Sequence, residues 1–87
     1  MKNYSEKVVG YVEKQGTFNG NDYHNYYLVT ILSENGIPVS CDSKNYKFKV
    51  DDVEDVLGTD DIESVVGACI KKTYFDKFGR LTGVDYE

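Results

Sequence analysis

Two short segments of this sequence combine basic side chains with aromatic rings, residues 44–49 and residues 77–80. The chain holds eight Tyr and four Phe but no Trp among 87 residues, more aromatic rings than a core of this size can use. Exposed rings can stack on nucleobases while basic side chains contact phosphates. A single Tyr can equally pack on a sheet with its hydroxyl in water. The excess as a whole therefore predicts a stacking or contact surface.

Side chains suited to catalysis or metal binding are sparse. His24 is the single histidine and has no nucleophile motif, phosphate-binding glycine loop or metal-ligand cluster around it. The acids of residues 51–63 lack the ligand spacing of an EF-hand. Cys41 and Cys69 are 28 residues apart without a CxxC pair, so we expect two free thiols. We expect no enzyme, no cofactor and no metal site.

The negative charge of the chain is concentrated in one segment. A net charge of −5 argues at face value against nucleic-acid binding. However, residues 51–63 contain seven acids and no base, which leaves eight acids against ten bases elsewhere, or +2. The acids are Asp51, Asp52, Glu54, Asp55, Asp60, Asp61 and Glu63. They fit a solvated helix, with docking to a basic partner, mimicry of nucleic acid or steering of strands as alternatives.

The length and the apolar pattern limit the class of protein. A chain of 87 residues and 9.9 kDa forms one small domain, which we place at residues 1–87. No apolar run reaches the roughly 20 residues that cross a bilayer. The first seven residues lack the apolar region of a signal peptide. We therefore expect a cytoplasmic protein without membrane contact.

Apolar periodicity predicts a mainly β fold. The predicted strands cover residues 7–15, 23–33, 37–50, 65–75 and 81–86, with an interruption near residues 42 and 43 left open. Gly10 interrupts the first strand and predicts a bulge or bend. Residues 16–22 are rich in turn formers and predict a long hairpin loop, whereas Asn35 and Gly36 predict a tight turn. Residues 76–80 predict a second hairpin loop.

The third strand has one packed face and one basic face. Tyr46, Phe48 and Val50 point one way, and Asn45, Lys47 and Lys49 point the other. In the second strand, Tyr26, Leu28, Thr30 and Leu32 share one face, opposite Tyr27, Val29 and Ile31.

A short helix follows the third strand. Val53, Val56 and Leu57 have helical spacing, and Gly58 would end the helix. Residues 60–63 begin either a second helical turn or the next strand.

This order of elements resembles the OB-fold, a five-stranded Greek-key barrel with one short helix between strands 3 and 4. The features that carry the resemblance are the glycine within Val8–Val12, a first hairpin rich in Asn, Gly and aromatics, and a basic-aromatic last hairpin. The chain is similar to the small single-stranded DNA-binding proteins of phages and mobile elements. Its segment Phe75–Leu81 is similar to the final hairpin of the filamentous-phage type.

The resemblance implies sequence-nonspecific binding of single-stranded DNA, with RNA as an alternative ligand. The binding surface of an OB-fold is formed by strands 2 and 3 with the loops between strands 1 and 2 and strands 4 and 5. The residues so implied are Phe18, Tyr23, Tyr26, Tyr27, Lys44, Lys47, Lys49, Lys77, Phe78 and Arg80, with Tyr11 added if it points outward. This requires residues 51–63 to lie away from that face.

A different class of function also fits the sequence. The acidic segment from Asp51 to Glu63 could dock on a basic partner, making the chain a small protein-binding accessory module. Under both hypotheses a homodimer is expected, because a small barrel offers a long strand little contact area.

Overall fold

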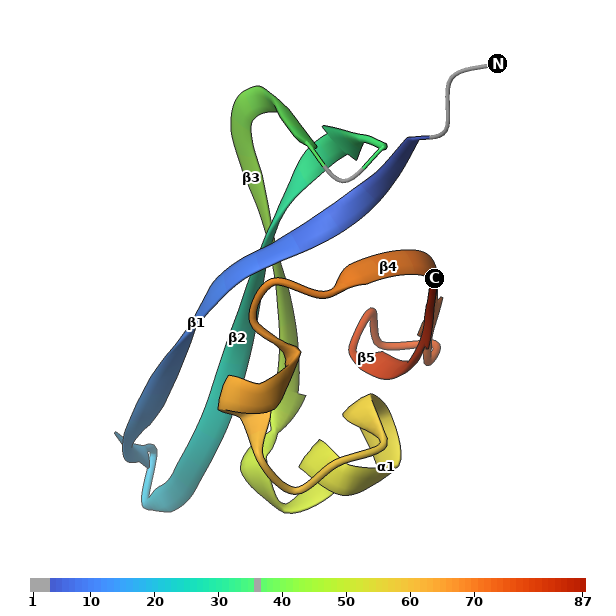
Figure 1. Cartoon of the computed structure of the whole chain (residues 1–87). Coiled ribbons are helices and arrows are strands. Elements are labelled where there is room, and N and C mark those ends of the chain that lie inside the picture. The colour runs from blue at the N-terminus through green and yellow to red at the C-terminus, as the bar shows by residue number, and fades with distance from the viewer. Residues whose placement is uncertain (1–3, 36) are drawn as a thin grey trace.

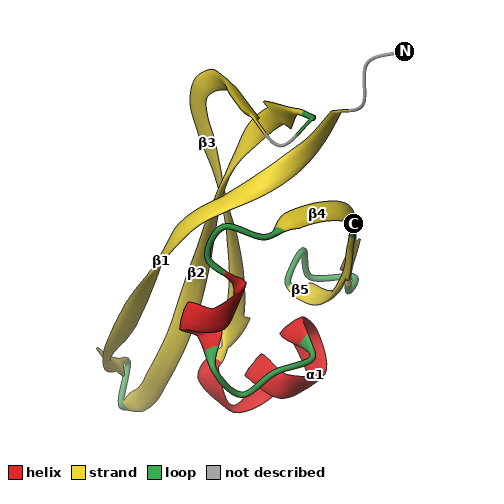
Figure 2. Cartoon of the chain, in the orientation of Figure 1, coloured by secondary structure: helices red, strands yellow, loops and turns green. Residues whose placement is uncertain are grey.

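The structure, a computed structural model, describes residues 4–35 and 37–87, the side chains of residues 40 and 41 excepted. Its strands are β1 (Tyr4–Phe18), β2 (Asn21–Glu34), β3 (Ile37–Lys49), β4 (Cys69–Phe75) and β5 (Leu81–Tyr86). Between β3 and β4 lie the 3-10 turn η1 (Val50–Asp52), helix α1 (Val53–Leu57) and the 3-10 turn η2 (Ile62–Val65). The prediction of a mainly β chain with one short helix is confirmed (Figure 2). None of the helices in the described part is long and apolar enough to cross a membrane.

The strands form one antiparallel sheet in the order β3-β2-β1-β4-β5. β1 pairs with β2 along one edge and, at Glu6 and Lys7, with β4 along the other. The ladder between β1 and β2 shifts register at a bulge between Val8 and Gly10. The bulge predicted at Gly10 is therefore confirmed. β5 approaches β3, but no ladder joins these two strands among the described residues. The sheet is open, and the closed barrel predicted from the sequence is not seen.

The core lies between the inner face of this sheet and the helical segment (Figure 1). Its buried residues are Val8, Leu28, Phe48, Val56, Leu57, Ile62, Val65, Ile70 and Leu81. The alternation predicted in β3 is confirmed, since Phe48 is buried while Lys47 and Lys49 are exposed. On β2, Leu28 and Thr30 are fully buried. Leu32, predicted on the same face, is exposed and Ser33 is buried instead, because the register shifts between Ile31 and Ser33.

The helix ends where its sequence predicts. Val56 and Leu57 are buried, and Gly58 adopts a φ of 78° while its amide donates to the carbonyl of Glu54 at 2.8 Å. Next, the carboxylate of Asp61 accepts the amide hydrogen of Glu63 at 3.1 Å and caps η2. Residues 62–65 are thus a 3-10 turn.

The predicted start of the fourth strand at residue 65 is wrong, since β4 begins at Cys69. Val65 is buried, but it reaches the core from η2 rather than from a strand. Gly67, with a φ of 93°, then turns the chain toward β4. Apolar periodicity alone cannot separate these two ways of burying a valine.

The first hairpin differs most from prediction. Residues 16–22 are not a long loop, because the ladder continues through Gly16–Tyr23 and Thr17–Asp22 to the very end. Asn19 and Gly20 have φ values of 52° and 79° and form the two-residue turn that connects β1 to β2. The hairpin therefore extends as a long paired arm (Figure 1).

The turn between β2 and β3 and the cysteines are described only in part. Asn35 has the positive φ of 53° expected in a tight turn, whereas the predicted Gly36 lies outside the described residues. Beyond the turn, Ser33 pairs with Pro38 but Ile31 pairs with Ser43, so the register shifts close to the predicted interruption. Cys69 is a free thiol as predicted, and the side chain of Cys41 lies outside the described part.

The folded state should lose stability in alkali, because folding raises the pKa of several tyrosines. The shifted residues are Tyr11, Tyr26, Tyr46, Tyr74 and Tyr86. Burial, followed by a hydrogen bond to Glu6, raises the pKa of Tyr46 furthest from its usual 10.0. The hydroxyl of Tyr74 donates to Asp85 at 2.6 Å, which raises the pKa of Tyr74. A phenol that keeps its proton in the folded state and loses it in the unfolded state favours unfolding once the pH exceeds the unfolded pKa.

We therefore expect the free energy of unfolding, measured with urea, to stay constant as the pH rises to about 9. It should fall above about pH 10. A Tyr46→Phe variant should lose less stability than the wild type across that alkaline range. Parallel losses in the two proteins would contradict the role given to Tyr46.

Candidate nucleic-acid interface

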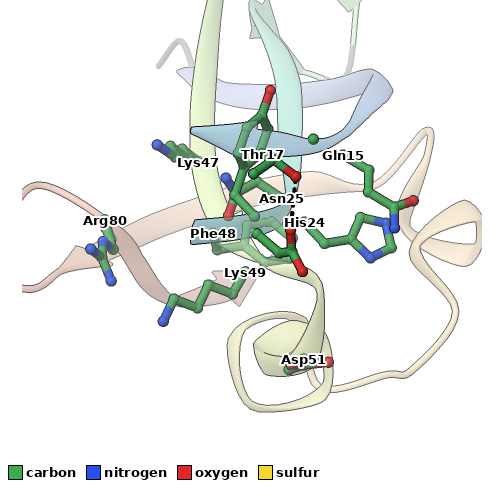
Figure 3. A pocket seen from close by; sticks show the side chains of 12 residues that line it. Gln15, Thr17, His24, Asn25, Lys47, Phe48, Lys49, Asp51 and Arg80 are labelled. Atoms are coloured by element: carbon green, nitrogen blue, oxygen red, sulfur yellow. Dashed lines mark hydrogen bonds between the residues drawn. The ribbon is translucent and has the colours of Figure 1, made fainter. Parts of the chain in front are cut away.

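A groove of about 600 Å³ lies between the paired arm of β1 and β2 and the end of β3 (Figure 3). One side is formed by the segments 15–17 and 22–25 of the arm. The other is formed by residues 47–49 of β3, together with Asp51 of η1 and Arg80, which precedes β5. The groove thus brings together segments that lie far apart in the sequence.

Three cations border this groove: Lys47, Lys49 and Arg80 (Figure 3). All three are exposed, and none forms an ion pair with another described residue. The alternation of β3 explains two of them, because burying Phe48 turns Lys47 and Lys49 toward solvent. Cations at a concave surface that no carboxylate of the described residues neutralises by an ion pair attract anions such as phosphate.

Tyr23 is held at the groove by a glycine on the facing strand. Gly16 pairs with Tyr23, and a Cβ added to Gly16 would lie 2.7 Å from the Tyr23 hydroxyl oxygen and 2.9 Å from ring carbon Cζ. The end of the ring therefore lies directly over the glycine. With 42% of its surface exposed, Tyr23 keeps a ring available for stacking.

The loop between β4 and β5 presents a second ring. Phe78 is 72% exposed, with Lys77 Nζ 5.2 Å and Arg80 Cζ 5.9 Å from its ring centroid. The carboxylate of Asp76 accepts the amide hydrogens of Phe78 and Arg80, both at 2.9 Å, and fixes the loop. The loop predicted at residues 76–80 is confirmed. Arg80 lies against the Phe78 ring and also lines the groove, so it connects the two.

No protein-family model, curated protein or solved structure matches this chain. The residues and their geometry therefore carry the functional proposal. Among the described residues, no group of three or more His, Cys, Asp or Glu could hold a metal ion.

Tyr27 belongs to the same outer face as the lysines. It pairs with Lys47 across the sheet, and Lys14 Nζ lies 4.9 Å from the centroid of its ring. The ring is half-buried, in contrast to the largely exposed ring of Phe78. Tyr27 therefore lies beside the groove and adds Lys14 to the basic side chains of this face.

Tyr11 and Tyr26 lie apart from these rings, on the core side of the sheet. Their rings meet edge to face at 5.7 Å, and Tyr26 also packs on Phe48 at 5.8 Å. The hydroxyl of Tyr11 donates to Glu63 at 3.1 Å, and this hydrogen bond raises the pKa of Tyr11. Both rings pack against the core rather than line the groove.

Phe18, Lys44 and Lys77 also lie outside the groove. Phe18 is exposed beside the turn at the end of the arm. Lys77 contributes to the loop of Phe78. Lys44 faces a different cavity and pairs with Glu6 at 3.7 Å. Its position on β3 explains this, because Lys44 is an odd number of residues from Lys47 and from Lys49.

The acidic segment does not lie wholly away from the basic face, so that expectation is wrong for its first residues. Asp51 lines the groove itself, and Asp52 and Asp55 border an adjoining cavity with Lys49 and Arg80. The cause is local, because η1 begins directly after Lys49. The acids limit the positive potential at this end of the groove.

Sequence reasoning missed the role of Gly16. The signal was present, since a two-residue turn at Asn19 and Gly20 places Gly16 opposite Tyr23. A Gly16→Ala substitution should displace the Tyr23 ring, because a Cβ 2.7 Å from its hydroxyl oxygen has no room. We expect it to weaken oligonucleotide binding, but by less than Tyr23→Ala, which removes the ring and should cost roughly 1–3 kcal/mol.

Gly10→Ala is the matched control for this substitution, because a Cβ there meets nothing within 4 Å. Fluorescence anisotropy with labelled oligo-dT measures both variants. Equal affinities of Gly16→Ala and wild type would show that the Tyr23 ring takes no part in binding.

Proposed function

We propose that this protein binds single-stranded DNA without general sequence preference. Bases stack on Tyr23 and Phe78, and phosphates contact Lys47, Lys49 and Arg80. The observation that supports this most is at the groove, where three cations that form no ion pair with the described residues meet an exposed ring. Stacking on separate rings requires unpaired bases, which favours a single strand over a duplex.

The strand order supports an OB-like arrangement for this function. β1 pairs with β2 and β4, which leaves β3 and β5 at the two edges, as in an OB barrel opened at one seam. We propose that the chain is such a five-stranded barrel. The surface that OB proteins use then corresponds to the groove between the arm, β3 and Arg80.

Salt dependence provides the direct test of this function. If three cations contact phosphates, the logarithm of the binding constant for oligo-dT should fall against the logarithm of salt with a slope of about −2. Anisotropy of a labelled oligo-dT of about 12 nucleotides, titrated at several salt concentrations, measures this slope. Absence of binding at low salt would overturn the proposal. An oligo-U of the same length compares RNA with DNA.

A second function is proposed on the exposure of the acidic segment. All seven of its acids are exposed, although Asp61 caps η2 and Glu63 binds Tyr11. The others are free to contact a basic protein partner. Changing Asp52, Asp55 and Asp60 to Asn should then abolish capture of that partner in a pulldown, whereas oligo-dT binding should be kept or strengthened, since Asp52 and Asp55 lie beside Lys49 and Arg80. Capture unaffected by these changes would remove this second function.

A further inference from the structure

A further cavity, of about 390 Å³, lies on the inner side of β3 and is lined by Glu6, Thr30, Ile31, Leu32, Asp42, Lys44, Tyr46 and Thr73. These residues come from β1, β2, β3 and β4, and none of them lines the groove described above. The cavity holds two carboxylates, Glu6 and Asp42, and one cation, Lys44, whose side chain is 72% exposed.

Glu6 is the central group of this cavity. Its side chain is only 20% exposed, and its Oε1 accepts from the Tyr46 hydroxyl, from Thr30 Oγ1 at 3.5 Å and pairs with Lys44 Nζ at 3.7 Å. All three contacts converge on one of the two oxygens. Because a carboxylate offers about four lone-pair sites, Glu6 can still accept hydrogen bonds from a ligand.

One aromatic ring, that of Tyr46, lines the cavity, and a second ring packs on it. Phe75 packs on Tyr46 with ring centroids 5.6 Å apart, and its ring is about half exposed. In nucleic-acid sites, carboxylates accept hydrogen bonds from bases, cations contact phosphates and aromatic rings stack on bases. A carboxylate, a cation and an aromatic pair are all present at this cavity.

The β4–β5 loop runs between a residue that contacts the cavity lining and a residue of the groove. Phe75 begins this loop beside the cavity, and Arg80 ends it at the groove. The loop is closed by hydrogen bonds between Asp76 and Arg80. The loop that carries Phe78 therefore runs from the ring that packs on Tyr46 to a cation of the groove.

We propose that this cavity holds one base of the bound strand and favours guanine there, with Glu6 accepting from the base and Lys44 contacting a phosphate. Guanine presents N1–H and the N2 amino group side by side, which matches a carboxylate acceptor. Thymine presents a single N–H between two carbonyl oxygens, which a carboxylate repels. The inference rests on the proposed function and adds a preference at one nucleotide to otherwise nonspecific binding.

The test compares two labelled oligonucleotides, oligo-dT and the same oligo-dT with one central dG. The wild type should bind the dG oligonucleotide about five- to tenfold more tightly. This factor is at the lower end of the range for one discriminating base contact. Glu6→Gln should bind both with the affinity that the wild type shows for oligo-dT. Glu54→Gln, the same change at an exposed acid of α1, should keep the preference.

The possible failures are distinguishable. If neither oligonucleotide binds, the proposed function fails. If both bind equally to the wild type, or if Glu6→Gln keeps the preference, the inference fails and the proposed function stands. Should Glu6→Gln unfold, amide NMR shifts of the wild type decide: the dG oligonucleotide, and not oligo-dT, should shift Lys44, Thr73 and Phe75. Identical shifts with the two ligands would overturn the inference.

Discussion

Replacing Lys47, Lys49 and Arg80 together by Glu is expected to abolish oligo-dT binding, with a loss of affinity of at least roughly a hundredfold. The variant loses three phosphate contacts and gains three repulsive charges at the same groove. Asp51, Asp52 and Asp55 lie close by and add to this repulsion. The salt dependence should disappear with the affinity, because no counterions remain to be released.

Single substitutions give the matched control for this result. Lys49→Glu at the groove should weaken binding severalfold, whereas Lys71→Glu on β4 makes the same charge change away from the groove and should weaken it far less. All these side chains are exposed, so thermal unfolding should be nearly unchanged, within about 0.5 kcal/mol per substitution. Equal losses for Lys49→Glu and Lys71→Glu would mean that only overall charge matters, and the groove would be rejected as the site.

The sequence was sufficient where one local pattern determined the structure. Lys47 and Lys49 could be assigned to the exposed face because the buried Phe48 lies between them in an uninterrupted alternation. The end of α1 was equally predictable, since Gly58 takes the left-handed conformation that few other residues adopt readily.

The arm was mispredicted because composition and pairing gave opposite signals. Residues 16–22 contain typical turn formers, yet only Asn19 and Gly20 form the turn. The other residues are held as strands by the cross-strand ladder, which includes the contact of Gly16 with Tyr23. Local propensity cannot report a contact that forms only when two strands are in register.

The candidate site was predicted in part for the same reason. Tyr23, Phe78 and Arg80 could be found from type and position, but the separation of Lys44 from the other lysines depends on which way each faces on β3. Tyr11 shows what could not be predicted from local sequence. The orientation of its side chain is set by the ring of Tyr26 on β2 and by Glu63, 52 residues away. Contacts of that range are decided by the tertiary fold.

The second large effect concerns stability, and we expect Phe48→Ala to destabilise the fold by about 3–5 kcal/mol. Phe48 is only 2% exposed and packs on Tyr26 at 5.8 Å, so its removal leaves a cavity in the centre of a small core. Because domains are typically stable by only about 5–15 kcal/mol, much of that margin would be lost. Urea unfolding followed by circular dichroism measures the change.

Phe78→Ala is the matched control, because it removes the same ring from a side chain that is 72% exposed. It should leave stability within about 0.5 kcal/mol of the wild type while lowering oligo-dT affinity by roughly 1–3 kcal/mol. The two variants thus separate a ring that holds the sheet together from a ring that contacts the ligand. If Phe78→Ala lost stability and kept its affinity, Phe78 would be a packing residue, and stacking would have to be sought on Tyr23 alone.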